Sequence, residues 1–498
     1  MKKGQIVKNA YMTVLQVIVT GATLFFAYRY ILHTLGLEKI GIWSIVLTTT
    51  SASRVGEIGI SGSVVKFTAK YMALKKVDKT VDVVQTAVIS ISIIFGMLLL
   101  GAYPLLDSGL HYFLPENAYS DGKILLPYAM LSLWTLSVAS VFQAGIDGCN
   151  RIDKRAAITI VGSISYLVFV LILVEPMGIV GLAYGQLLQS IILLLLNWFY
   201  VRKELLSLPV FPCRWSKPLF LEMITYGLNF QIASMASLLY EPVTKILLGK
   251  YGGLAMTGYY EMANRMVLQF RTLLVSANQV LVPYVAELQE TDPESIGTLF
   301  QRSYSMLMYL STIYYSAILV ALPFISTIWI GTYSPAFILF SVLLVIGWCI
   351  NSLNAPAYFI NLGIGELKWN TISHVSIALM NGVLGMAMGH AYGGNGVVLA
   401  WILSLSIGSM IISLSYLFKT KKSIFSLLPG ENRTILIISI VGVVISYMIS
   451  NRLKSISGDI PSALLAMAFF MCFTIYFYWN NVWRKKMIEL FVLKFKKI

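Results

Sequence analysis

The chain has 498 residues, of which 57% are hydrophobic and only 12% are charged, and its mean hydropathy is +0.77. A soluble domain carries about twice that charged fraction, so the composition excludes an ordinary soluble protein. The net charge of +15 does not require a nucleic-acid partner, because lysine and arginine collect in the cytoplasmic loops of membrane proteins. The composition therefore indicates an integral membrane protein.

The apolar residues recur in blocks of about 20, the length of a helix that crosses roughly 30 Å of hydrocarbon. Runs such as Ile191–Leu196 do not alternate in polarity, as a transmembrane strand would. We therefore predict an all-α integral membrane protein with fourteen transmembrane helices. The predicted spans are Tyr11–Leu35, Ile40–Val64, Val83–Leu105, Ile124–Gly145, Ala156–Val174, Ile179–Tyr200, Phe220–Leu247, Ala255–Pro283, Leu299–Ile330, Ala336–Leu362, Asn370–Met388, Gly396–Phe418, Thr434–Ser450 and Pro461–Trp479.

The distribution of basic residues predicts the orientation. With the N-terminus inside, about 27 of the 37 lysines and arginines lie in cytoplasmic segments and about 6 lie in outer loops. Both termini are therefore predicted to be cytoplasmic, with Cys213 inside and the loop around Asp107–Asp121 outside. This bias, together with the spans, predicts a multi-pass protein of the cytoplasmic (inner) membrane.

The sequence shows no pattern typical of a soluble enzyme. The four cysteines and four histidines are scattered and have no metal-ligand spacing, and no phosphate-binding Gly-Lys-Ser/Thr loop is present. A membrane-embedded glycosyltransferase or polymerase would need a large catalytic outer loop, whereas the longest one here, Leu106–Lys123, has about 18 residues. We expect a protein without enzymatic activity and without a cofactor; whether a proton or a sodium ion drives it is left open.

An internal repeat is visible at an offset of 217 residues. The segment Gly36-Leu-Glu-Lys-Ile-Gly41 resembles Gly253-Leu-Ala-Met-Thr-Gly258, and Arg54 corresponds to Arg271. Six spans separate the matching segments, so the sequence predicts a parallel repeat of two six-helix bundles related by a pseudo-twofold axis near the membrane normal. The predicted organisation is an N-terminal bundle (1–205), a cytoplasmic linker (206–217), a C-terminal bundle (218–418), a cytoplasmic loop (419–433), helices 13 and 14 (434–480) and a basic cytoplasmic tail (481–498).

Charges inside membrane spans are costly and therefore point to function. Three acid–base pairs have helical spacing and could neutralise themselves on one helix face: Arg54 with Glu57, Glu241 with Lys245, and Glu261 with Arg265. Arg29 and Arg271 have no acidic partner at such a spacing. The candidate substrate-binding residues are Arg29, Arg54, Arg265 and Arg271, and the candidate gating or coupling residues are Glu57, Glu261, Lys245 and His374.

The arginines indicate the charge of the substrate. Arg54, Arg265 and Arg271 come from corresponding spans of the two repeats and Arg29 comes from span one, so a cleft between the bundles would be cationic. Such a cleft suits a phosphate or diphosphate, which arginine binds in a bidentate manner. His374 has two possible roles: a proton-linked switch or a packing side chain.

The chain resembles the polysaccharide-transporter branch of the multidrug/oligosaccharidyl-lipid/polysaccharide exporter superfamily, the O-antigen-type oligosaccharide flippases. The resemblance lies in Gly36 to Gly41 followed by Ile-Trp-Ser-Ile-Val, in Glu57-Ile-Gly59, and in Gly258-Tyr-Tyr-Glu-Met-Ala-Asn-Arg265. It implies two six-helix bundles around a V-shaped cationic cleft that opens alternately to each side. It also implies a substrate of oligosaccharide on an isoprenoid (undecaprenyl-type) diphosphate carrier.

We therefore expect a flippase for lipid-linked oligosaccharide units in cell-surface polysaccharide assembly, with membrane lipids, a polymerase and chain-length proteins as further partners. Two alternatives remain within the superfamily. A multidrug cation antiporter would need carboxylates in its cleft to bind a cationic substrate, whereas this chain has arginines there. A flippase for the peptidoglycan precursor lipid II would share both the fourteen helices and the cationic cavity.

Overall fold

The structure is a computed structural model, and it describes residues 3–51, 59–276, 278, 281–423, 427–428 and 430–486. Within these ranges the regular elements are all helical. The chain divides into two compact units: Met1–Glu261 with Gly385–Val397, and Met262–Leu384 with Val398–Ile498. Each unit is described by itself.

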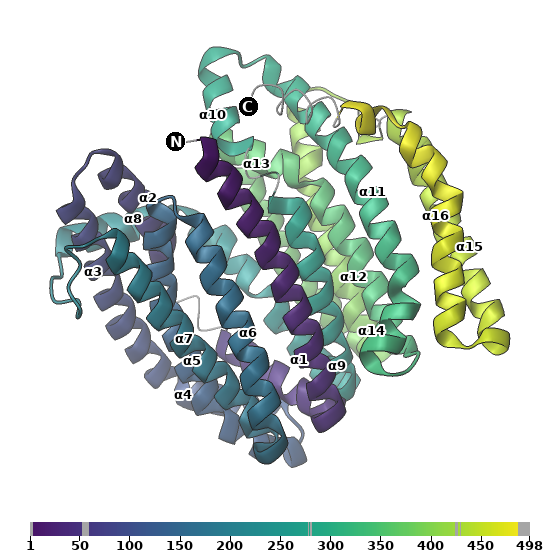
Figure 1. Ribbon diagram of the computed structural model, residues 1–498, viewed down its shortest axis with the longest axis horizontal. Coiled ribbons are helices and arrows are strands. Elements are labelled where there is room, and N and C mark those ends of the chain that lie inside the picture. Colours follow the sequence, from purple (N-terminus) through teal and green to yellow (C-terminus); the bar gives the residue numbers. More distant parts are fainter. Residues whose placement is uncertain are drawn as a thin grey trace. The chain divides into compact units, whose positions relative to one another are not determined.

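The first unit is built around long helices that lie side by side. In Figure 1, α5, α6 and α7 form one layer of this unit, and α1 packs along α6. Small residues such as Ala183 and Gly181 let α7 approach α6 closely. The elements are α1 (Lys3–Ser51), α2 (Ile60–Ala73), α3 (Val77–Ser90), the π-helical turn η2 (Ile91–Phe95), α4 (Gly96–Phe113), α5 (Glu116–Gly148), α6 (Ile152–Met177), α7 (Ile179–Glu204), α8 (Lys217–Leu238) and the first part of α9 (Tyr240–Ser276).

The second unit contains the rest of α9 and the helices that follow. The last two helices pack against each other and against α11, where the Asn432 side chain donates a hydrogen bond to the backbone oxygen of Ser305 at 2.7 Å. The middle of α14, Gly385–Val397, belongs to the first unit. The elements are α10 (Leu281–Thr291), α11 (Ser295–Ile330), α12 (Pro335–Leu353), α13 (Ala355–Ile364), α14 (Lys368–Lys419), α15 (Gly430–Ser457) and α16 (Asp459–Asn480).

Ten helical stretches among the described residues are long and apolar enough to cross a membrane. Two of them, Tyr11–Ser51 and Lys368–Lys419, contain a kink, at Gly36 and at Gly393. The prediction of an all-helical, membrane-spanning protein is therefore confirmed. The count of fourteen helices and the orientation of the termini stay predictions.

The backbone agrees locally with the predicted repeat. Gly36 breaks α1 at φ 80°, ψ 173°, and Gly253 breaks α9 at φ 81°, ψ 173°. These glycines are 217 residues apart, and their positive φ strains any residue with a Cβ atom. The superposition of two six-helix bundles stays a prediction. The kinks at Gly36 and Gly253, where the two matched segments begin, have the same geometry.

Prolines interrupt two spans that the sequence analysis treated as continuous. The span predicted for Phe220–Leu247 is divided at Leu239, because α8 ends at Leu238 and α9 begins with Tyr240, two residues before Pro242. The span predicted for Ala336–Leu362 is divided at Asn354, just before Pro356. Proline lacks the amide hydrogen that a helix interior needs, so it is placed in the first turn of a new helix.

Two other predicted spans include residues outside the described ranges. The span predicted for Ala255–Pro283 is described as α9 up to Ser276, and Pro283 falls in the first turn of α10. The span predicted for Ile40–Val64 is described only as far as Ser51, and α2 begins at Ile60. Arg54 and Glu57 lie outside the described residues.

Candidate functional site

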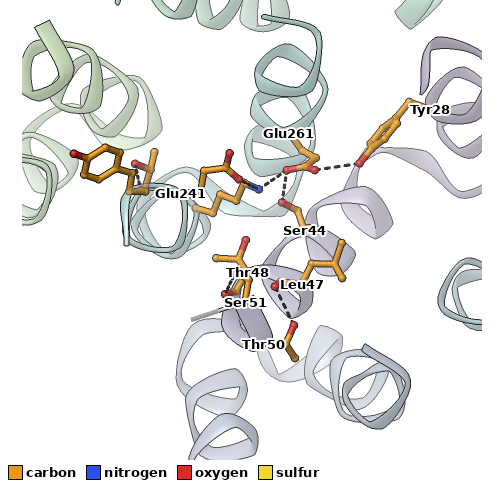
Figure 2. Close-up of polar contacts among 11 residues, drawn as sticks. Tyr28, Ser44, Leu47, Thr48, Thr50, Ser51, Glu241 and Glu261 are labelled. Carbon is orange, nitrogen blue, oxygen red and sulfur yellow. Dashed lines mark hydrogen bonds and ion pairs between the residues drawn. The ribbon is translucent and has the colours of Figure 1, made fainter. Parts of the chain in front are cut away.

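Glu261 of α9 is the centre of a buried polar cluster in the first unit. Its carboxylate is 1% exposed and accepts hydrogen bonds from the hydroxyl of Tyr28 at 3.1 Å and from the hydroxyl of Ser44 at 2.8 Å. The ammonium of Lys245 lies 2.7 Å from the same carboxylate. Figure 2 shows Tyr28 and Ser44 of α1 both reaching Glu261 of α9. We call Tyr28, Ser44, Lys245 and Glu261 the Glu261 cluster.

Lys245 connects the Glu261 cluster to a second carboxylate. The lysine is 3% exposed, and its ammonium also lies 3.0 Å from Glu241, four residues earlier on α9. Glu241 is only half-buried. A buried ammonium is costly unless opposite charges and hydrogen bonds surround it. The positive charge of Lys245 is therefore already compensated within the protein.

The members of the Glu261 cluster occupy equivalent positions of the repeat. Ser44 and Glu261 are 217 residues apart, and so are Tyr28 and Lys245. The sequence analysis named Glu261 and Lys245 but missed Tyr28 and Ser44. Subtracting the repeat offset of 217 residues from Lys245 and Glu261 would have found both.

The backbones of the two matched segments touch beside this cluster. A Cβ atom on Gly41 would lie 2.2 Å from the carbonyl oxygen of Leu254, and one on Gly258 would lie 2.4 Å from the carbonyl oxygen of Leu37. These two contacts exchange under the 217-residue offset, since Leu37 corresponds to Leu254 and Gly41 to Gly258. Only glycine allows backbones to approach this closely. The spacing of the repeat glycines is therefore explained by a reciprocal helix contact.

Arg271 lies further along α9, in the second unit, and its partners there are neutral. Its guanidinium donates a hydrogen bond to the side-chain oxygen of Asn351 at 2.8 Å and lies 4.4 Å from the ring centroid of Trp348. Asn351 is in turn oriented by its own hydrogen bond to Ser409 at 2.7 Å. The Nε atom of Arg271 is buried without a hydrogen-bond partner among the described residues. The result is a fixed cation that retains its charge.

Arg29 is an exposed cation on α1 of the first unit. It lines an open pocket of about 430 Å³ between α1 and α6, with His33 one turn further along α1. The rest of the lining is aromatic or aliphatic, including Phe26 and Leu171. No acidic side chain is among the described residues that line this pocket. Arg29 thus resembles Arg271 in having no ion pair with a carboxylate in the part of the chain that the structure describes.

The remaining candidates are less defined. Arg265 is half-buried on α9, one turn after Glu261. His374 is half-buried on α14, and its ring packs edge-on against that of Tyr358 at 5.8 Å between centroids. The structure therefore unites Glu261 and Lys245 in one cluster and places Arg29, Arg271 and His374 within their own units.

A comparison with protein families places this fold. Residues 6–289, more than half of the chain, match the model of a family described as polysaccharide biosynthesis protein. The chain belongs to this polysaccharide biosynthesis protein family. The matched residues include Arg29 and the whole Glu261 cluster.

Known relatives of this polysaccharide biosynthesis protein agree with that placement. "Probable flippase AglR" of Haloferax volcanii is 22% identical over 399 residues, 77% of each chain. "Amylovoran biosynthesis protein AmsL" of Erwinia amylovora is 24% identical over 303 residues, 58% of this chain and 74% of that protein. The solved structure of the lipid II flippase MurJ in an inward closed conformation has a TM-score of 0.73 at 14% identity, covering 97% of this chain and 100% of that one. At that identity the structural likeness shows the fold.

Proposed function

We propose that this protein is a flippase that moves isoprenoid-diphosphate-linked oligosaccharide units across the cytoplasmic membrane by alternating access, for cell-surface polysaccharide assembly. Its membership of the polysaccharide biosynthesis protein family and the name of its relative AglR support this proposal. The observation that carries it is Arg271, a fixed cation in a membrane-spanning protein whose described partners are neutral.

Arg271 and Lys245 differ in their partners, and we propose that Arg271 binds the substrate whereas Lys245 has a structural role. Lys245 lies between two carboxylates, Glu241 and Glu261, so it has little attraction left for an anionic substrate. Arg271 is held by an amide and an indole ring, which fix its position without cancelling its charge. A diphosphate crossing hydrocarbon faces a large desolvation barrier, and guanidinium groups lower it by binding phosphate oxygens in a bidentate manner.

Arg29 extends the same chemistry to a second position. Its pocket combines a guanidinium and an imidazole with apolar walls, a combination that suits a phosphate attached to a hydrocarbon chain. We include Arg54 and Arg265 in the proposed cationic site from their positions in the sequence. The glycan itself would be selected by other groups.

The reciprocal contact between residues 36–44 and 253–261 supports alternating access. The two matched segments meet backbone to backbone at Gly41 and Gly258, and the hydrogen bond from Ser44 to Glu261 joins them. The ion pair with Lys245 fixes the Glu261 carboxylate from within α9. Opening this contact would require these interactions to break together. We propose Glu261 and Lys245 as gating residues, and retain Glu57 and His374 as further gating or coupling candidates for a proton or sodium ion.

The rival functions make different demands on the cluster. A multidrug cation antiporter needs a carboxylate that is available to its substrate, whereas Glu261 is already bound by Lys245. A lipid II flippase would use the same cationic groups. Transport assays in vesicles with an O-antigen-type lipid-linked glycan and with lipid II, run side by side, would separate these two substrates. A polysaccharide polymerase and chain-length proteins are the proposed downstream partners.

Complementation of a glycan-export defect tests the cationic site. Charged hydrogen bonds contribute roughly 1.5–3 kcal/mol each, so Arg271→Ala should reduce export at least about tenfold, and Arg271→Lys should restore only part of it. The double variant Arg29→Ala/Arg271→Ala should abolish export while membrane abundance stays near normal. Arg302→Ala, an exposed arginine on α11, is the matched control. Full export by the double variant would overturn the proposal.

A further inference from the structure

A second basic site lies between α2 and α8 in the first unit, away from the residues discussed so far. Here an open pocket of about 470 Å³ is lined by two lysines, two aromatic rings and three further side chains. We call it the α2–α8 pocket. Its lining residues are Lys66, Phe67, Lys70, Leu221, Glu222, Thr225 and Tyr226.

The two walls of the α2–α8 pocket are held in place by buried contacts. The Ser63 hydroxyl of α2 donates a hydrogen bond to the backbone oxygen of Met223 of α8 at 2.7 Å. Above this bond the rings of Phe67 and Tyr226 meet edge to face at 6.1 Å between centroids. The pocket therefore has a preformed shape, as small-ligand sites usually do.

The lysines of the pocket are positioned but not neutralised. The ammonium of Lys66 lies 3.6 Å from the ring centroid of Tyr226, and Lys70 is one helical turn away on the same face of α2. Glu222 lines the same pocket, yet within the described part of the chain it forms no ion pair with either lysine. The pocket thus has an excess positive charge, and one of its two cations is fixed in place by a ring.

The surroundings of the pocket are typical of a membrane surface. The stretch Val77–Phe113, which begins just after the turn that follows α2, is apolar enough to span a membrane. Leu221 lines the pocket and Leu74 follows Lys70 by four residues, and each is about half-exposed. Exposed apolar and aromatic side chains next to lysines are characteristic of the boundary between lipid and water.

We propose that the α2–α8 pocket binds the phosphodiester head group of an anionic membrane lipid. The phosphate would lie between Lys66 and Lys70, the Thr225 hydroxyl can donate to a phosphate oxygen, and the lipid chains would lie along Leu221 and Leu74. A lipid is favoured over a soluble anion because the pocket combines its charges with exposed apolar residues. This proposal does not depend on what the protein transports.

Lipid titration of the purified full-length protein in detergent tests this site. Native mass spectrometry would count bound short-chain phosphatidylglycerol, with short-chain phosphatidylcholine as the neutral comparison. Near a membrane surface each lysine contributes appreciably to anionic lipid binding, so Lys66→Gln/Lys70→Gln should weaken phosphatidylglycerol binding by about tenfold. The control is Lys75→Gln/Lys76→Gln, which removes the same charge from exposed lysines just outside the pocket and should leave binding nearly unchanged.

The role of the ring gives a second, independent readout. Tyr226→Phe keeps the aromatic face under Lys66 and should retain binding, whereas Tyr226→Leu removes it and should weaken binding. If Lys66→Gln/Lys70→Gln fails to give a monodisperse protein, Lys70→Gln alone serves instead, since Lys70 is exposed. If both double-lysine variants lose phosphatidylglycerol binding equally, the lipid is attracted by the general surface charge. If inorganic phosphate displaces phosphatidylglycerol as well as the lipid itself does, the pocket is a site for soluble anions. Either result, or undiminished binding by the pocket variants, would overturn the proposal.

Discussion

Ser44 and Glu261 share a hydrogen bond of 2.8 Å although 217 residues separate them, and this separation is the offset of the internal repeat. Equivalent residues of two symmetry-related repeats touch each other only close to their axis, so the predicted pseudo-twofold axis would pass near this contact. At such a place identical charges would repel. The two repeats differ here, with serine and tyrosine in the first and glutamate and lysine in the second, so that one acid and one base meet.

Removing one charge of the Glu261 cluster should destabilise the protein strongly. Lys245→Met leaves the Glu261 carboxylate buried without its ammonium. Glu261→Gln removes the buried carboxylate from Lys245 and leaves the half-exposed Glu241 at 3.0 Å. The loss of one partner from a buried pair costs about 3–5 kcal/mol. Thermal unfolding of the purified protein in detergent would measure both effects.

The double variant Lys245→Met/Glu261→Gln should be clearly more stable than the sum of the two single effects predicts, because it removes both buried charges and the remaining carboxylate, Glu241, is half-exposed. Glu241→Gln is the control, since half-exposed Glu241 should contribute less than about 1 kcal/mol. Additive losses in the double variant would show that the two charges are not coupled.

The reciprocal glycine contact predicts equal effects at two distant positions. Gly41→Ala and Gly258→Ala each place a Cβ atom against a backbone carbonyl, at 2.2 and 2.4 Å. A backbone cannot yield as a flexible side chain does, so each variant should lose at least about 1–3 kcal/mol. Thermal unfolding and membrane abundance would report both losses.

Gly62→Ala is the matched control for these two variants. Gly62 lies within α2, and a Cβ atom there would meet nothing within 4 Å. Alanine should be neutral or slightly stabilising at this position because it favours helix more than glycine does. A loss at Gly62 equal to that at Gly41 would mean that the close approach is not the cause.

Asn351→Asp should separate the charge of Arg271 from its packing. The substitution places a carboxylate 2.8 Å from the guanidinium in nearly the same volume, so the protein should stay folded or become more stable. Glycan export should nevertheless fall by about tenfold or more, because the cation is neutralised. Ser409→Ala, which removes only the hydrogen bond that orients Asn351, should have a smaller effect. Unchanged export in Asn351→Asp would argue against a fixed cation in transport.

Two cysteines allow the predicted orientation to be tested. Burial, with a smaller contribution from nearby Glu204, raises the pKa of the Cys149 thiol to about 11. Only roughly one molecule in ten thousand then carries the reactive thiolate at neutral pH. Cys213 is exposed. In a variant that retains only Cys213, a membrane-impermeant maleimide should label inverted vesicles and spare intact cells.

The matching variant that retains only Cys149 should react slowly at neutral pH on either side. As the pH is raised toward 11, its labelling should increase about tenfold per pH unit, because the fraction of thiolate increases by that factor. Labelling of Cys213 in intact cells would reverse the predicted topology. Fast labelling of Cys149 at pH 7 would contradict its burial.

The sequence by itself determined the class of this protein and most of its helices. Hydrocarbon thickness demands apolar blocks of one length, so composition and block length were sufficient for the membrane-spanning character and for boundaries such as those of α6 and α7. Glycines were equally informative. The repeat matched Gly36 with Gly253, and the structure gives the backbone the same positive φ at both.

Only the tertiary structure decided which charges are compensated. From spacing alone, Lys245 pairs with Glu241 on its own helix, but in three dimensions it also reaches Glu261, sixteen residues later and beyond the kink at Gly253. Likewise Arg271 is held by Asn351 and Trp348, which belong to another helix. Periodicity reports which residues share a helix face, whereas the charge state of a site depends on side chains that a kink or a helix crossing brings together. For this reason Arg29 and Arg271 were found from the sequence, and the neutral partners that the described residues give Arg271 were found only from the fold.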